Sequence, residues 1–220
     1  MQISKFVINK LDTMYPSLAQ YLDVNELGDM GYCFTKEICN TYGYVMEGEA
    51  EINGKIISQE QYFSYWSLEP QKITYTGKLV VFTRVGYKGQ NCIGGPIEER
   101  GRLTYIDGCS DSLLIYPPRF GDPSLNQLYF PNNITQSFHT HPSIRLGVVA
   151  KGAGFATLKN GEDEYEITLA TGDMFCLEES ELHRFRTTAR EMTIIIYHPD
   201  GDWGPTDHDH VMKNRTYVTK

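Results

Sequence analysis

The chain has 220 residues, of which 40% are hydrophobic and 22% are charged, and its formal net charge at pH 7 is −8. This composition is typical of a globular protein and excludes a fibrous or disordered chain. An acidic surface repels phosphate backbones and anionic lipids, so we expect neither nucleic acid nor a membrane as a partner. No stretch approaches the roughly 18 consecutive apolar residues of a membrane span.

The cysteines and the first residues of the chain predict a cytoplasmic protein. The five cysteines are odd in number and show no CxxC spacing, so we interpret them as free thiols in a reducing compartment. The N-terminal residues contain no long apolar stretch followed by a small-residue cleavage site, and therefore do not have the pattern of a signal peptide.

Short runs rich in Val, Ile, Thr, Tyr and Phe, separated by Gly, Pro, Asn and Asp, predict an all-β chain. Residues 17–22, which follow Pro16, are the only predicted helix. Asn53-Gly54 and Asn160-Gly161 predict type I′ hairpin turns, in which both central residues need positive φ. The predicted strands are residues 43–52, 79–85, 113–116, 127–130, 144–150, 154–158, 164–167, 174–177 and 192–197.

The two halves of the sequence repeat one pattern weakly. The residues around Gly48 match those around Gly152, and matching apolar runs follow in the same order in both halves. We therefore predict two tandem β-barrel units, residues 1–101 and 102–220, joined by a Gly-rich stretch near residues 90–110.

The candidate site lies in the second half, which contains all six histidines. His139 and His141 are two residues apart in a stretch that leads into a predicted strand, so in extended backbone their imidazoles share a face and can hold one metal ion. His183 follows a turn-like stretch. We expect His183 to share a strand face with Phe185, and the arginines at positions 184 and 186 to share the other.

These residues resemble the two motifs of the cupin superfamily. The first motif corresponds to His139-Thr-His141 and continues to Gly152, and the second runs from Gly172 to His183. The resemblance covers the C-terminal half well and the N-terminal half mainly through its strand pattern. It implies a fold of two tandem cupin-like β-barrels (jelly rolls). It also implies that the three histidines bind one divalent metal ion.

Arg145 occupies the position at which cupins usually have a glutamate ligand. A guanidinium stays protonated and cannot donate a lone pair to a metal. The site therefore resembles the three-histidine variant found in some mononuclear non-haem iron dioxygenases, which implies Fe(II), with Zn, Mn and Ni as alternatives. We predict that Arg145 orients a carboxylate of the substrate.

The N-terminal unit lacks comparable ligands. Aligning its glycines with those of the second half places Thr35 and Glu37 opposite the His139–His141 pair, and aligning the later strands places Gln71 opposite His183. One carboxylate and two weak donors do not form a transition-metal site. We expect this barrel to be metal-free and to act as a packing partner or as one wall of a substrate pocket.

Other polar residues receive structural interpretations. We interpret His198, at a predicted strand end, as a rim histidine, and Cys176 as a core residue. His208 and His210 lie in a tail that we interpret as a solvated loop, with a tail across the barrel mouth as the alternative. Arg119 could approach the same mouth.

Three functions are compatible with the pattern. The first is an Fe(II) oxygenase that acts on a small, anionic molecule. The second is an isomerase, lyase or hydrolase that uses Zn, Mn or Ni as a Lewis acid. The third is a cupin module that binds a small molecule without turnover. A homodimer is plausible because cupins often pair their edge strands.

Overall fold

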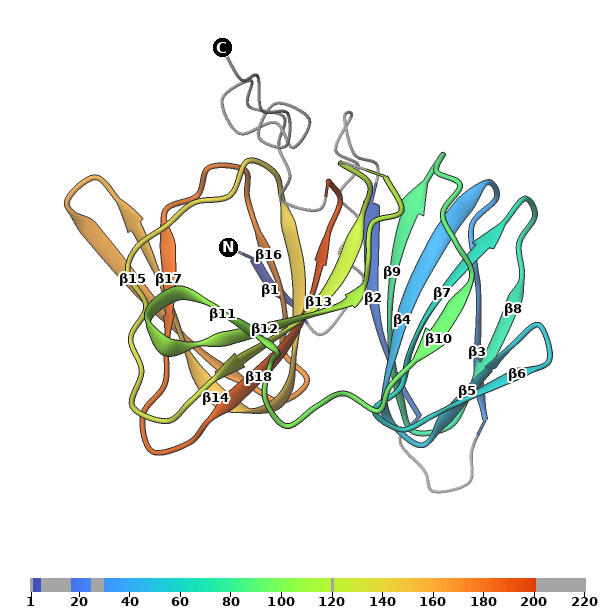
Figure 1. Cartoon of the computed structure of the whole chain (residues 1–220), viewed down its shortest axis with the longest axis horizontal. Coiled ribbons are helices and arrows are strands. Elements are labelled where there is room, and N and C mark those ends of the chain that lie inside the picture. The colour runs from blue at the N-terminus through green and yellow to red at the C-terminus, as the bar shows by residue number, and fades with distance from the viewer. Residues whose placement is uncertain (1, 5–16, 25–29, 120, 201–220) are drawn as a thin grey trace, which may run out of the picture.

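The computed structural model describes residues 2–4, 17–24, 30–119 and 121–200, and strands dominate these residues (Figure 1). The all-β prediction is confirmed; the one helical element in the described part of the chain is a single 3-10 turn, Ile106–Gly108. No helix in that part is long and apolar enough to cross a membrane.

The helix predicted at residues 17–22 is wrong. The segment is strand β2 (Ser17–Asp23), which pairs antiparallel with β9 (Lys78–Val85) along its whole length. A helix of six residues is unstable by itself, because nucleation costs more than so few hydrogen bonds return. Pairing with β9 satisfies the backbone of the segment and buries Ala19 completely.

The N-terminal half, residues 17–94, forms two sheets. One has the order β10-β7-β4-β9-β2 and the other the order β3-β8-β5-β6. Besides β2 and β9, its strands are β3 (Gly31–Phe34), β4 (Cys39–Glu47), β5 (Glu49–Ile52), β6 (Lys55–Ser58), β7 (Tyr62–Ser67), β8 (Lys72–Tyr75) and β10 (Cys92–Gly94).

The C-terminal half, residues 103–198, forms a nine-stranded sheet with β1 of the N-terminus. Its path is β1-β16-β14-β18-β13-β12-β11, and β15 and β17 pair with the long strand β14. The strands are β1 (Gln2–Ser4), β11 (Leu103–Thr104), β12 (Ser110–Ile115), β13 (Ser124–Phe130), β14 (Arg145–Asn160), β15 (Asp163–Ala170), β16 (Met174–Leu177), β17 (His183–Arg186) and β18 (Met192–His198).

The same pairing pattern occurs in both halves. Strand β4 pairs with β7 and β9, as β14 pairs with β16 and β18. Strand β5 pairs with β6 and β8, as the second part of β14 pairs with β15 and β17. The repeated glycines, Gly48 and Gly152, both have a φ of +78°, and a Cβ at either position would collide with a backbone carbonyl oxygen. Within the described residues, no sheet closes on itself.

The two predicted hairpin turns differ. Asn53 and Gly54 have φ of 50° and 72°, which confirms a turn with two left-handed residues. In the second hairpin Asn160 is still paired, with Asp163, so the turn lies one residue later than predicted. Only its first residue, Gly161, has a positive φ, a feature of type II′ turns.

The core between the halves uses alternate residues of the central strands. Leu146 and Val148 of β14 pack toward the N-terminal half, whereas Val149 packs into the core of the C-terminal half. Tyr197 of β18 also faces the N-terminal half. Its ring stacks on Phe82, with 5.8 Å between ring centroids and 8° between planes, and its hydroxyl lies 3.2 Å from that of Ser17.

Replacing Tyr197 with alanine should cost about 3–5 kcal/mol of unfolding free energy, because it empties a fully buried aromatic site between the halves. The matched control is Tyr165→Ala on β15, where the side chain is 56% exposed and the cost should stay below about 0.5 kcal/mol. Urea unfolding of both variants measures the difference. Equal costs would contradict the assignment of Tyr197 to the core between the halves.

Candidate metal centre

The three predicted histidines come together at one end of β17. His139 and His141 lie in an irregular extended segment before β14 begins, and His183 is the first residue of β17. An isolated antiparallel bridge joins the two segments: the His139 N–H donates to the carbonyl of His183 at 2.9 Å, and the His183 N–H donates back at 3.0 Å. This backbone pair places the rings of His139 and His183 side by side.

The three imidazoles form a compact cluster. Ring centroids are 4.4 Å apart for His139 and His183, 5.1 Å for His141 and His183, and 5.2 Å for His139 and His141. One ring nitrogen from each residue lies within 4.8 Å of the other two. Within the described residues, this is the one group of three or more His, Cys, Asp or Glu side chains with such spacing.

Backbone carbonyls fix the orientation of two of the rings. Nδ1 of His139 lies 3.0 Å from the carbonyl oxygen of Ser137, and Nδ1 of His183 lies 2.7 Å from that of Glu181. A carbonyl can only accept, so each Nδ1 carries the proton and each Nε2 carries a lone pair. Nε2 of His183 is buried and has no hydrogen-bond partner in the described structure. A buried acceptor without a partner is costly, and a metal ion at this point would satisfy it.

Burial keeps the imidazoles neutral. Loss of solvent lowers the pKa of His139 below its ordinary value of 6.5. The pKa of His141 falls to about 4 and that of His183 to about 3, mainly through burial, with a smaller contribution from the positive charge of Arg145. Neutral imidazole is the form that binds metals, so the site is ready for coordination at neutral pH.

Arg145 is fully buried behind the cluster. Its Nη1 donates to the carbonyl and hydroxyl of Ser143 and to the carbonyl of Ile144, and lies 3.6 Å from a carboxylate oxygen of Asp200. Burial lowers the pKa of Arg145 to about 10, so it remains charged at neutral pH. Asp200 lies two residues after the end of β18, and the sequence pattern did not predict that it faces the charge of Arg145. Substrate contact by Arg145 stays a prediction.

The interpretation of His198 as a rim residue is wrong. It is only 6% exposed and lies on the face of β18 that carries Ile194 and Ile196 into the C-terminal core. Burial lowers its pKa far below 6.5, and the charge of Arg145 adds to this effect. His198 therefore belongs to the polar surroundings of the cluster. Every residue of β18 is buried, so no alternation of polar and apolar residues revealed its orientation.

The corresponding place in the N-terminal half has the same backbone geometry and different side chains. The Thr35 N–H donates to the carbonyl of Gln71 at 2.9 Å, as His139 donates to His183, which confirms the predicted alignment of these positions. Here the Thr35 hydroxyl accepts from the Gln71 N–H and lies 3.1 Å from the Ser67 hydroxyl. Glu37 is exposed. The polar atoms of Thr35 are thus used within the protein, and the absence of a metal there stays a prediction.

Other predicted positions have mixed outcomes. Cys176 is buried, as predicted. His183 and Phe185 are buried while the two arginines between and after them are partly exposed, which confirms the predicted alternation along β17. Arg119 forms an ion pair with Asp122, and its approach to the barrel mouth stays a prediction. The tail with His208 and His210 lies outside the described residues.

Solved structures with similar folds are cupin proteins. A cupin 2 conserved barrel domain protein from Leptotrichia buccalis is 14% identical, with a TM-score of 0.58 over 89% of this chain and 88% of that chain. Protein YlbA from E. coli is 17% identical, with a TM-score of 0.57 over 90% and 89% of the two chains. No protein-family model and no curated protein sequence matches the chain.

Two enzymes are among these similar structures. Salicylate 1,2-dioxygenase from Pseudoaminobacter salicylatoxidans is 13% identical, with a TM-score of 0.56 over 84% of this chain and 68% of that one. Oxalate decarboxylase from Bacillus subtilis, which has Mn(II) centres, is 9% identical, with a TM-score of 0.55 over 84% and 73%. At these identities the likeness shows a cupin fold and leaves the activity open.

In chelator-treated protein, the imidazoles should titrate far below pH 6.5, at about 4 for His141 and about 3 for His183. Because the folded-state pKa values are depressed, the unfolded chain binds protons first, and stability should fall as the pH drops from about 6.5 toward 4. NMR titration of the imidazoles and urea unfolding at several pH values measure both effects. His141→Asn should weaken the pH dependence. Midpoints near 6.5 would contradict the buried environment.

Arg145→Met should destabilise the protein by about 3–5 kcal/mol, because it breaks a buried ion pair by removing the charge that faces the Asp200 carboxylate. Adding Asp200→Asn should recover part of this loss, with a coupling of about 0.5–3 kcal/mol. The control is Arg186→Met, which breaks a partly exposed pair with Glu166 and should cost less than about 1 kcal/mol. Purely additive losses in unfolding experiments would rule out a coupled pair.

Proposed function

We propose that the chain is a metal-dependent cupin enzyme, with His139, His141 and His183 as ligands of one divalent ion. The observation that carries this proposal is the convergence of three neutral imidazoles around the buried, unpartnered Nε2 of His183. Three imidazoles suit Fe, Zn and Ni, with Mn as a further alternative. We favour Fe(II) because no carboxylate among the described residues belongs to the cluster, which therefore resembles the three-histidine site of some mononuclear non-haem iron dioxygenases.

The proposed reaction is the oxygenation of a small anionic molecule. When bound, Fe(II) would supply redox chemistry with dioxygen and a positive charge that neutral imidazoles do not cancel. The chain contributes three features: it orients two rings through the carbonyls of Ser137 and Glu181, it keeps His183 away from water, and it holds the Arg145 charge near the rings. The third feature favours an anionic substrate over a cationic one.

We propose for Arg145 an electrostatic role, with or without direct substrate contact. It stands where cupins usually have a glutamate ligand, so a negative charge is replaced by a positive one. Asp200 offsets part of this charge at 3.6 Å. A substrate carboxylate near the metal would then meet a more positive surrounding than in a four-ligand site.

Two tandem cupin modules, a homodimer and a cytoplasmic location complete the proposal. The repeated strand pairing supports two modules, of which the N-terminal one would act without metal. Two alternatives have other observable consequences. A different metal would favour a Lewis-acid isomerase, lyase or hydrolase, and a lack of turnover would favour a non-catalytic binding protein.

The deciding experiment is metal analysis of protein purified without added metal, followed by measurement of oxygen uptake with a panel of small carboxylates. Bound iron and substrate-dependent uptake would support the oxygenase. Bound zinc, manganese or nickel without uptake would replace it by Lewis-acid chemistry. If the protein bound none of these metals, the proposal of a metal-dependent function would be wrong.

His139→Ala, His141→Ala and His183→Ala should each weaken metal binding by more than about 100-fold, since loss of an outer hydrogen-bond partner alone costs 10–100-fold. The matched control is Gln71→Ala, which changes the position in the N-terminal half that corresponds to His183 and should leave the metal content unchanged. Metal titration of the four variants checks this. Unchanged content in the histidine variants would disprove the ligand assignment.

A further inference from the structure

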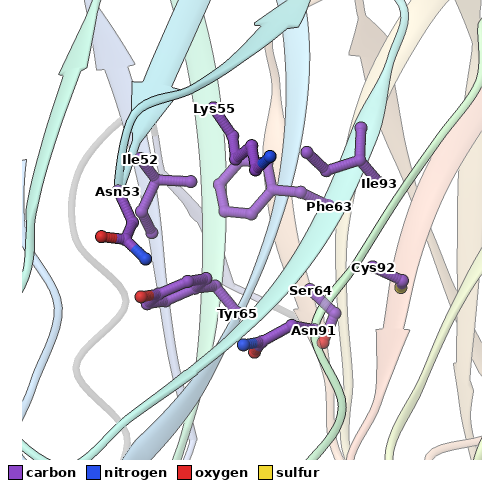
Figure 2. A pocket seen from close by; sticks show the side chains of 9 residues that line it. All are labelled: Ile52, Asn53, Lys55, Phe63, Ser64, Tyr65, Asn91, Cys92 and Ile93. Atoms are coloured by element: carbon purple, nitrogen blue, oxygen red, sulfur yellow. The ribbon is translucent and has the colours of Figure 1, made fainter.

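The N-terminal half contains an open groove of about 370 Å³ at the edge where its two sheets meet (Figure 2). The turn between β5 and β6 forms one wall, and β7 together with the edge strand β10 forms the other. The lining residues are Ile52, Asn53, Lys55, Phe63, Ser64, Tyr65, Asn91, Cys92 and Ile93. None of them belongs to the histidine cluster.

The floor of the groove is apolar and rigid. Ile52 and Phe63 are 2% and 1% exposed and belong to the core of the N-terminal half, and Tyr65 packs against that core. Ile93 is 45% exposed at the rim. Figure 2 shows the two aromatic rings among the lining residues. Phe63 is too buried to offer a ring face to a ligand, whereas Tyr65 is partly exposed and held by core packing. Its ring offers a preformed surface on which a flat ligand can stack with little loss of side-chain entropy.

The polar groups at the groove favour an anion. Among the described residues, no aspartate or glutamate lines it, although the chain as a whole carries a net charge of −8. Lys55 has no ion-pair partner among the residues that the structure describes. Asn91 accepts a hydrogen bond from the Trp66 N–H through its Oδ1 at 2.7 Å, so its NH2 group is the end that can donate to a ligand. Asn53, in the β5–β6 turn, adds a second side-chain amide.

We propose that this groove is a second small-molecule site, specific for a carboxylate with a flat apolar body. The body would lie on Tyr65, and the carboxylate would accept a hydrogen bond from Lys55, which lies at the end of the groove away from Asn91 (Figure 2). The volume lies in the range of small-ligand pockets, about 300–1,000 Å³. Because β10 belongs to the connection between the halves, a ligand bound here would also stabilise that connection. The site is independent of the proposed metal chemistry.

Calorimetric titration of the full-length protein with phenylacetate tests this site. Acetate has the same charge without the ring, and phenethylamine has the ring with the opposite charge. We expect binding of phenylacetate and at least tenfold weaker binding of the other two, since a hydrogen bond to a charged group is worth about a factor of ten or more. No binding of phenylacetate, or equal binding of phenethylamine, would overturn the proposal.

Variants then locate the bound probe. Lys55→Gln should weaken phenylacetate binding about tenfold, and Ile93→Glu, which places a carboxylate on the exposed rim, should abolish it. Lys72→Gln removes the same charge from a different exposed position and should bind like the wild type, as should His139→Ala. Loss of binding in His139→Ala with retention in Lys55→Gln would place phenylacetate at the histidine cluster and overturn the proposal. Metal content measured in the same samples tests the metal centre separately.

Discussion

The first part of β14, residues 145–150, and the whole of β18 are buried on both faces, and the rest of the structure depends on this double burial. One face of each strand packs against the N-terminal half, and the other encloses the core of the C-terminal half. Such strands become continuous apolar runs rather than alternating ones. The few polar groups at their ends, Arg145 and His198, are therefore placed in a nearly water-free environment. Their electrostatic influence on the nearby histidines follows from that burial.

The two halves share one backbone arrangement and use it differently. In each, an extended segment ahead of the first long strand is hydrogen-bonded to the start of a later strand, through Thr35 and Gln71 or through His139 and His183. Hydroxyls that bond to one another consume their donors and acceptors inside the protein. Imidazoles whose Nδ1 atoms are held by carbonyls keep their Nε2 lone pairs available. Because both halves share the backbone arrangement, only the side chains distinguish the Thr35–Gln71 position from the candidate metal centre at His139 and His183.

Charge distribution separates the two candidate ligand sites. In the histidine cluster His183 is buried, the other two imidazoles are half-buried, and the Arg145 guanidinium lies nearby, so an anion there would be held mainly through a metal and its field. The groove of the N-terminal half is open, with one lysine, two side-chain amides and the partly exposed Tyr65 among its lining residues. A ligand there would rely on stacking and direct hydrogen bonds. The whole chain has a negative net charge, yet each of the two sites has a positively charged side chain, Arg145 or Lys55. Both sites therefore favour anions, in contrast to the rest of the protein.

Local pattern was sufficient for much of this protein. The apolar runs and turn residues predicted an all-β chain, and the repeated glycines marked the same left-handed backbone position in both halves. These features depend on periodicity and positive φ, which short stretches of sequence encode. The convergence of His139, His141 and His183 was implied by the resemblance of the residues around them to the cupin motifs. Residues 17–22 were assigned wrongly because a short segment takes its structure from its neighbour, β9. The pairing of Arg145 with Asp200 and the inward direction of His198 were decided only by the tertiary structure, because they depend on which faces of fully buried strands meet.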